Sequence, residues 1–235
     1  MKKVGNNLRQ IGQCGYCGRE QYLTRDHVPP RTLFPEPRSA GLITVPCCEQ
    51  CRSGWSDDDE YFRTVVINAG QLYGDKLAAP VNDAMLRSLS KARKRRFSQM
   101  IIESICEIPL ETDSGIYLGH ALILKFDQDR VNRVSQRIVR GLFFYEKGYP
   151  LPPEYEVIGL LKQFGTEPLL ETLRQHGVSF PAPRIIQSGV FAYTFRATSE
   201  DPNTTMWLAV LYQKLPFVGF TGYPNQLREQ DETGI

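Results

Sequence analysis

The sequence predicts an α+β protein with a small cysteine-rich N-terminal part and a larger body of mixed helices and strands. Five of its six cysteines lie between positions 14 and 51, where short apolar runs alternate with loops rich in proline and glycine. After about residue 65 the segments lengthen, and their apolar residues recur at helical spacing in some and form β-rich runs in others. The 235 residues suffice for one or two domains, and we expect two, over residues 1–68 and 69–235.

Two short strands are expected in the N-terminal part. Residues 21–28 (QYLTRDHV) and residues 42–45 (LITV) have the composition of β-strands. Four prolines between positions 29 and 37 keep the connecting segment extended, because proline continues neither a strand ladder nor a helix.

A helix is expected after the second strand. Ser56 and Asp59 form a variant capping box, and the acidic residues 57–60 suit the positive N-terminal end of a helix. The helix should end near Asn68. The order is therefore strand, loop, strand, helix, and two pairs of cysteines flank the strands.

The body of the chain should contain both helices and strands. Apolar residues spaced three and four apart predict two longer helices, and Gly177 should end a shorter one. Runs of β-branched and aromatic residues predict three strands. The expected helices span residues 82–102, 129–145 and 166–176, and the expected strands span residues 155–161, 188–197 and 205–213.

Composition excludes several classes of protein. No apolar run approaches the roughly 18 to 20 residues that cross a bilayer, so we expect no membrane association. The first ten residues, MKKVGNNLRQ, lack the apolar segment of a secretory signal, and we expect a cytoplasmic location. In a reducing compartment, clustered cysteines indicate metal binding rather than disulfides. The net charge of +2 is too small to indicate a nucleic-acid partner by itself.

The paired cysteines predict a structural zinc site. Cys14 and Cys17 form one C-x2-C knuckle, and Cys48 and Cys51 form a second. This spacing directs two thiolates at one tetrahedral ion, and four thiolates leave no open position for catalysis. Cys47 could replace Cys48 through a C-x3-C spacing, although Cys48 gives matching knuckles.

Asp26 and His27 lie between the knuckles, at the end of the first expected strand. A carboxylate is a hard ligand for a divalent cation, and a histidine is a general base at neutral pH. A lone histidine is more often structural. Neighbouring side chains in a strand also point to opposite faces, so one site could use both only where the strand is distorted or the backbone turns.

The motifs taken together resemble the HNH endonucleases, specifically their zinc-knuckle branch with the ββα-metal fold. The resemblance covers roughly the first 65 residues, and the order and spacing of five elements carry it: C14GYC17, L23TRDHVPP30, L42ITVP46, C48EQC51 and S56DDDEYF62. It implies a metal-dependent hydrolase of phosphodiester bonds in nucleic acid, with DNA favoured and host defence a common context.

The resemblance also implies roles for individual residues. His27 matches the general base that deprotonates water, and Asp26 matches a ligand of a catalytic Mg²⁺ or Mn²⁺. The four knuckle cysteines match the ligands of a structural Zn²⁺ ion.

Arg52 departs from the family pattern, because this position commonly carries an Asn or His that completes the catalytic metal site. A guanidinium repels a cation. A carboxylate from residues 57–60, with Asp58 and Asp59 as candidates, could replace the missing ligand, although helix capping alone also explains these acids. Alternatively Arg52 contacts the scissile phosphate. In the third interpretation the site is weak or inactive, and the module only binds nucleic acid.

Basic residues supply candidate nucleic-acid contacts. Arg25 and Arg31 flank the Asp26–His27 pair, with Arg38 nearby. Residues 91–96 (KARKRR) form the densest basic run, in which Arg93, Lys94 and Arg96 are candidates, although a solvated helix surface explains the run equally well. A nuclease, a silent nucleic-acid-binding module and a protein-interaction scaffold built on the zinc site therefore remain open.

Overall fold

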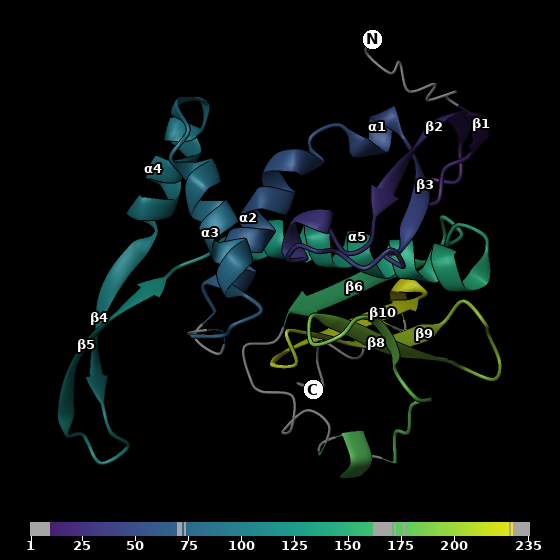
Figure 1. Cartoon of the computed structure of the whole chain (residues 1–235). Coiled ribbons are helices and arrows are strands. Elements are labelled where there is room, and N and C mark those ends of the chain that lie inside the picture. The colour runs from purple at the N-terminus through teal and green to yellow at the C-terminus, as the bar shows by residue number, and fades with distance from the viewer. Residues whose placement is uncertain are drawn as a thin grey trace.

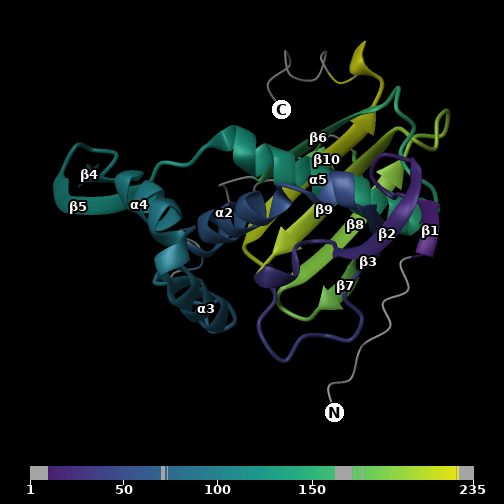
Figure 2. The same cartoon turned by 90° about the horizontal axis from the view of Figure 1, so that it is seen from above.

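The computed structural model describes residues 10–69, 72, 74–161, 171, 173–175, 177–225 and 227. Its architecture is α+β, as predicted. A small sheet with its helices lies on one side of a long helix, α5, and a larger sheet lies on the other (Figure 1). A helical pair and a β-hairpin project from one end of this arrangement (Figure 2).

The small sheet is antiparallel, with strand order β1-β2-β3. Both predicted strands are confirmed, whereas β1 was not predicted. The following helix begins one residue before Ser56, and its N-cap is Gly54 in a left-handed conformation with no side-chain cap, so the predicted capping box is wrong. The elements are β1 (Gln10–Gln13), β2 (Glu20–His27), a 3-10 turn (Arg31–Leu33), β3 (Thr44–Cys48), α1 (Glu49–Arg52) and α2 (Trp55–Ile67).

The single helix predicted over residues 82–102 is wrong. Two helices, α3 (Ala79–Leu89) and α4 (Arg95–Glu103), are joined by a 3-10 turn (Ala92–Lys94) that contains part of the basic run. Tertiary contacts favour the break, because Lys94 reaches Asp57 of α2 and the Ser98 hydroxyl donates to the Leu89 carbonyl at 2.6 Å. An unpredicted hairpin follows, formed by β4 (Ile105–Glu111) and β5 (Tyr117–Leu124).

Helix α5 (Gln128–Lys147) confirms the helix predicted over residues 129–145. The Asp127 carboxylate accepts a hydrogen bond from the Arg130 N–H at its start, and Gly148, with φ 78°, ends it. Its buried apolar residues face β6 and β10 on one side and α2 and β3 on the other. The helix therefore joins the two sheets.

The large sheet is antiparallel, with strand order β6-β10-β9-β8-β7. The three predicted strands are confirmed with shorter bounds, and β7 and β10 were not predicted. Gly159 of β6 permits close packing, because a Cβ there would lie 2.5 Å from the Ser135 backbone of α5. The predicted helix over residues 166–176 lies mostly outside the described residues. The strands are β6 (Glu156–Leu161), β7 (Arg184–Gln187), β8 (Phe191–Ala197), β9 (Thr205–Leu211) and β10 (Leu215–Gly222).

One hydrophobic core runs through these layers. Trp207 of the large sheet, Leu142 of α5, Phe62 of α2 and Val45 of β3 are all buried in the same cluster. The division between residues 68 and 69 stays a prediction. The core contains residues from both sides of that boundary. Within the described ranges, no helix has both the length and the apolar character that a bilayer span requires.

Candidate metal centre and the Asp26–His27 region

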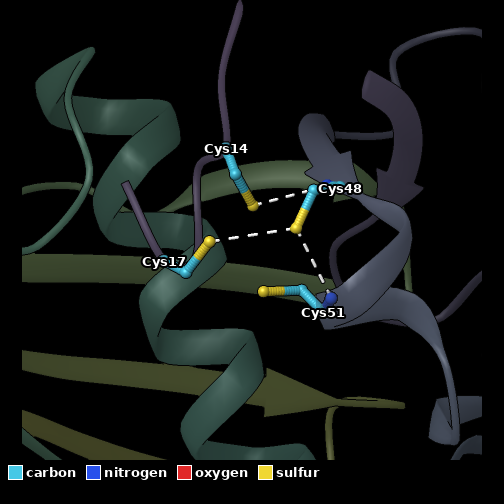
Figure 3. A group of neighbouring side chains, drawn as sticks. All are labelled: Cys14, Cys17, Cys48 and Cys51. Atoms are coloured by element: carbon cyan, nitrogen blue, oxygen red, sulfur yellow. Dashed lines mark hydrogen bonds between the residues drawn. The ribbon is translucent and has the colours of Figure 1, made fainter. Parts of the chain in front are cut away.

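The four knuckle cysteines converge on one point. Cys14 and Cys17 come from the turn between β1 and β2, and Cys48 and Cys51 come from the end of β3 and from α1 (Figure 3). Their sulfur atoms lie within 4.8 Å of one another. The Sγ atoms of Cys17 and Cys48 are 3.8 Å apart, which is about the edge of a tetrahedron with 2.3 Å metal–sulfur bonds. These cysteines are positioned to bind a metal ion, and four thiolates are the donors of structural zinc.

Backbone amides and a neighbouring thiol support the sulfur atoms. The N–H of Cys48 donates to Cys14 Sγ at 3.4 Å, and the N–H of Cys51 donates to Cys48 Sγ at 3.5 Å. A hydrogen bond with the Cys47 thiol, together with the amides, lowers the pKa of Cys14 to about 3. Cys47 is fully buried beside the cluster and is not part of it. The prediction of Cys48 over Cys47 agrees with this geometry.

The clustered thiols need positive charge. Burial raises the pKa of Cys17, and burial together with hydrogen bonds to Cys17 and Cys48 raises that of Cys51. Arg140 of α5 lies close enough to Cys51 for that sulfur to raise its pKa, although burial lowers the pKa of Arg140 more strongly. A divalent cation would supply the missing charge, and Arg140 would offset the excess negative charge of four thiolates.

Asp26 lies on the buried face of β2. It pairs with Val45 in the β2–β3 register, and directly paired residues of antiparallel strands share a face. The Tyr16 hydroxyl donates to Asp26 Oδ2 at 2.6 Å. Burial raises the pKa of Tyr16 well above its usual value, so this tyrosine stays protonated and continues to donate.

A second carboxylate lies near Asp26. Burial raises the pKa of Asp59 of α2, the Arg137 guanidinium opposes this shift, and the charge of Asp26 adds to it. Arg137 forms an ion pair with Asp59 and also stacks over the Trp55 ring, 4.4 Å from its centroid. Asp26 and Asp59 therefore form a pair of mutually repelling carboxylates beside one arginine.

His27 leaves β2 on the opposite face from Asp26. Its backbone pairs regularly with Thr44, so the strand is not distorted at this position. The imidazole is half-buried, and burial and then the charge of Arg31 lower its pKa below 6.5; the charge of Asp26 opposes this shift, and Arg38 adds a smaller lowering. His27 is thus a neutral imidazole with two cationic neighbours at pH 7. The Nε of Arg38 is buried and has no hydrogen-bond partner within the described ranges.

The acidic residues of α2 are engaged in ion pairs. Asp58 accepts hydrogen bonds from Arg130 at 2.8 Å and from Arg133 at 3.1 Å, and Asp59 is paired with Arg137. Asp58, a candidate cation ligand from the sequence, therefore connects α2 to α5 instead. Arg52, the last residue of α1, is exposed. Among the described residues, the four cysteines form the one cluster of three or more His, Cys, Asp or Glu side chains close enough to hold a metal ion.

The predicted nucleic-acid contacts occupy two separate regions. Arg25 and Arg31 are exposed, on β2 and just after it, on the His27 side. Arg93 is exposed in the 3-10 turn between α3 and α4, and Arg96 is exposed at the start of α4. Lys94 forms ion pairs with Asp57 at 3.1 Å and with Glu60 at 2.5 Å, so it connects this turn to α2.

Sequence reasoning missed the partners that organise this region. Tyr16 as the hydrogen-bond donor to Asp26 has no sequence signal beyond its place inside the first knuckle. The arginines of α5 have a signal, because Arg130, Arg133, Arg137 and Arg140 recur at helical spacing and form a basic stripe that complements the acidic run.

No family model, curated protein or solved structure matches the chain.

Proposed function

We propose that the chain is a zinc-stabilised nuclease of the HNH type that hydrolyses phosphodiester bonds of nucleic acid, with DNA favoured. The environment of His27 carries the proposal. An imidazole whose pKa is lowered by burial and by Arg31 and Arg38 is unprotonated at neutral pH, as a general base must be. The exposed Arg31 supplies positive charge beside the base, where a phosphodiester would approach, whereas Arg38 is ion-paired with Glu36.

The zinc site would act as a frame for this region. It would hold the turn between β1 and β2 against the end of β3, and Tyr16 lies inside that turn, between Cys14 and Cys17. Tyr16 donates to Asp26, so the position of the carboxylate depends on the position of the knuckle. Loss of zinc should therefore change the position of the Asp26 carboxylate, although Asp26 is not among the zinc ligands.

Asp26 is the proposed protein ligand for a catalytic Mg²⁺ or Mn²⁺. Its Oδ2 accepts from Tyr16, which leaves Oδ1 for a cation, and the nearby Asp59 would gain from a positive charge between the two carboxylates. When bound, such a cation polarises a phosphate oxygen and stabilises the leaving oxygen. Asp58 is excluded from this role while Arg130 and Arg133 hold both of its oxygens.

A nucleic-acid-binding module without hydrolysis is the second candidate. Three observations favour it: Asp26 and His27 lie on opposite faces of β2, the exposed Arg52 replaces the usual metal ligand, and Asp58 is held by arginines. In this version the exposed Arg25 and Arg31 bind phosphates and His27 has no chemical role.

A cleavage assay separates the candidates. Plasmid DNA, single-stranded DNA and RNA are incubated with the full chain and Mg²⁺, Mn²⁺ or EDTA, beside His27→Ala and a matched control, His120→Ala. His120 is 53% exposed in the β4–β5 hairpin and stands outside the site. The nuclease predicts cation-dependent cutting that His27→Ala abolishes and His120→Ala retains. Salt-sensitive binding without cutting identifies the second candidate instead.

A further inference from the structure

Exposed cations surround the turn between α3 and α4. None of them forms an ion pair within the described ranges, whereas Lys94, in the same run, is paired with Asp57 and Glu60 of α2. In both views α3 and α4 lie on the far side of α2 from β2, which carries His27 (Figures 1 and 2). This surface, the basic tip, is therefore separate from the His27 region. It consists of Lys91, Arg93, Arg95 and Arg96.

Two arginines of the basic tip stand where a helix end disfavours them. Arg95 and Arg96 are the first two residues of α4, and the start of a helix carries partial positive charge. The first turn of α4 has no acidic residue, and its N-cap, Lys94, provides no side-chain cap. The two cations therefore destabilise the start of α4, and a bound polyanion would relieve that repulsion.

The same two arginines lie on the exposed face of α4. The opposite face is buried, because Ile101 belongs to the core and Phe97 packs edge to face against Tyr61 of α2. The acidic residues of the two helices lie away from the turn, since Asp83 is in the first half of α3 and Glu103 is the last residue of α4. The basic tip therefore presents uncompensated positive charge to the solvent.

A cleft at the turn brings two of the cations to one place. It has a volume of about 390 Å³, and Lys91 and Arg95 both line it. Ser98 and Gln99 add polar side chains to the same cleft, and Leu89 and Ile102 add apolar ones. A phosphate group in this cleft would have a lysine of the turn and an arginine of α4 within reach.

The chemistry of the tip favours the backbone of a nucleic-acid duplex. Three of its four cations are arginines, whose planar guanidinium groups pair with phosphate through two hydrogen bonds. Single-strand binders stack bases on aromatic rings, but Phe97, the one aromatic residue in the sequence from 86 to 104, packs on Tyr61. A bilayer surface takes an apolar anchor, and Ile102 is the one large hydrophobic residue of α4 that is exposed.

We propose that the basic tip is a second, non-catalytic anchor that binds the backbone of double-stranded nucleic acid, independently of its sequence. The proposal rests on the proposed function, because both candidates there act on nucleic acid. The anchor would hold a duplex at a surface separate from His27, through contacts that weaken as the salt concentration rises.

Fluorescence anisotropy of a labelled DNA duplex, titrated with the full chain at several salt concentrations and without added Mg²⁺ or Mn²⁺, tests the anchor. The double variant Arg95→Glu, Arg96→Glu should weaken binding at least about tenfold and make the slope of log affinity against log salt shallower by about two. The same variant should raise the midpoint of thermal unfolding by about 2–4 °C, because acidic residues suit the start of a helix. The matched control is Lys76→Glu, Arg196→Glu, which makes the same charge change at exposed positions before α3 and on β8.

The outcomes separate the anchor from the nuclease. A tip variant that binds the duplex as tightly as the native chain overturns the anchor, and cutting by the native chain would still support the nuclease. Tip-dependent binding by the native chain and by His27→Ala, with no cutting, supports the anchor and contradicts the nuclease. A tip variant that loses both binding and thermal stability contradicts the proposal, because the arginines would then serve the fold.

Two further probes test the choice of ligand. A single strand of the same length should bind the native chain more weakly than the duplex, and equal affinities that the tip variant lowers equally contradict the preference for a duplex. Phosphatidylserine vesicles should not bind. Vesicle binding without duplex binding would identify the tip as a membrane surface and overturn the proposal.

Discussion

The pKa of His27 connects a single residue to the pH dependence of the proposed activity. Burial lowers this pKa first, and Arg31 lowers it further. A general base acts unprotonated, so cleavage should be constant near pH 7 and fall as the pH drops through a value below 6.5. In Arg31→Gln the acid limb should move to higher pH, because the variant loses a charge that disfavours the imidazolium. A limb that stays in place or moves to lower pH in the pH–rate profile contradicts this assignment.

Tyr16 is expected to position Asp26 without taking part in the chemistry. Tyr16→Phe removes the only hydroxyl that donates to Asp26 within the described ranges and leaves a charged acceptor unsatisfied. We expect about 1–3 kcal/mol of lost unfolding free energy. Urea denaturation measures it, and Tyr22→Phe, at a 60% exposed position on β2, is the control that should change little. Equal losses in both variants would contradict a role for this hydrogen bond.

At the scale of elements, ion pairs between α2 and α5 hold the N-terminal module to the long helix. Asp58 is the centre of this contact, because Arg130 and Arg133 both donate to it. Asp58→Asn should cost roughly 1–3 kcal/mol of unfolding free energy at pH 7. Asp57→Asn is the control, since its side chain is 70% exposed and, among the described residues, its carboxylate pairs with Lys94 alone. Thermal or urea unfolding of the two variants measures the difference.

The same contact has a predicted pH dependence. Burial of Asp58 opposes ionisation, but the hydrogen bonds from Arg133 and Arg130 outweigh it and the pKa of Asp58 falls below 3.8. A carboxylate with a lowered folded-state pKa stabilises the fold above its unfolded pKa of about 3.9, and that stabilisation is lost as the pH falls through the folded value. The difference in unfolding free energy between the native chain and Asp58→Asn should therefore shrink in acid. A difference in unfolding free energy that stays constant from pH 7 to pH 3 contradicts this prediction.

Local signals in the sequence predict some elements and miss others for physical reasons. The apolar spacing of α5 and the β-rich composition around Asp26 are intrinsic to those segments, and both predictions are confirmed. Residues 82–102 contain no glycine or proline that marks a break, and the helix divides because Lys94 pairs with α2. The four knuckle cysteines could be assigned as candidate metal ligands from their spacing alone. The Tyr16–Asp26 and Asp58–Arg130 contacts could not, because they depend on tertiary structure.

At the scale of the whole molecule, the core links the metal centre to the large sheet. Cys14 and Cys48 belong to the same buried cluster as Val139 and Trp207. Gly141 of α5 lets the small module pack closely, because a Cβ there would lie 2.5 Å from Val28 and 3.2 Å from the Tyr16 hydroxyl. The state of the metal site should therefore influence regions that are distant in the chain.

Gly141→Val tests this coupling. The larger side chain cannot fit between α5 and the N-terminal module, so we expect a loss of about 1–3 kcal/mol of unfolding free energy. We also expect the variant to release its metal more readily to a chelator. Gly115→Val is the reference for metal retention, because no described residue lies within 4 Å of a Cβ at Gly115, in the hairpin loop, although its φ of 80° makes that substitution locally strained. Equal metal retention in the two variants would contradict the coupling.

The metal content of the purified chain tests the central claim most directly. Native mass spectrometry, together with elemental analysis, should find one zinc ion per chain, and Cys48→Ser should lose it and unfold the N-terminal module, whereas Cys106→Ser, in the hairpin, should retain it. A chain that folds with no bound metal, or a Cys48→Ser variant that keeps both its zinc and its fold, would contradict the four-cysteine metal frame on which the proposed nuclease rests.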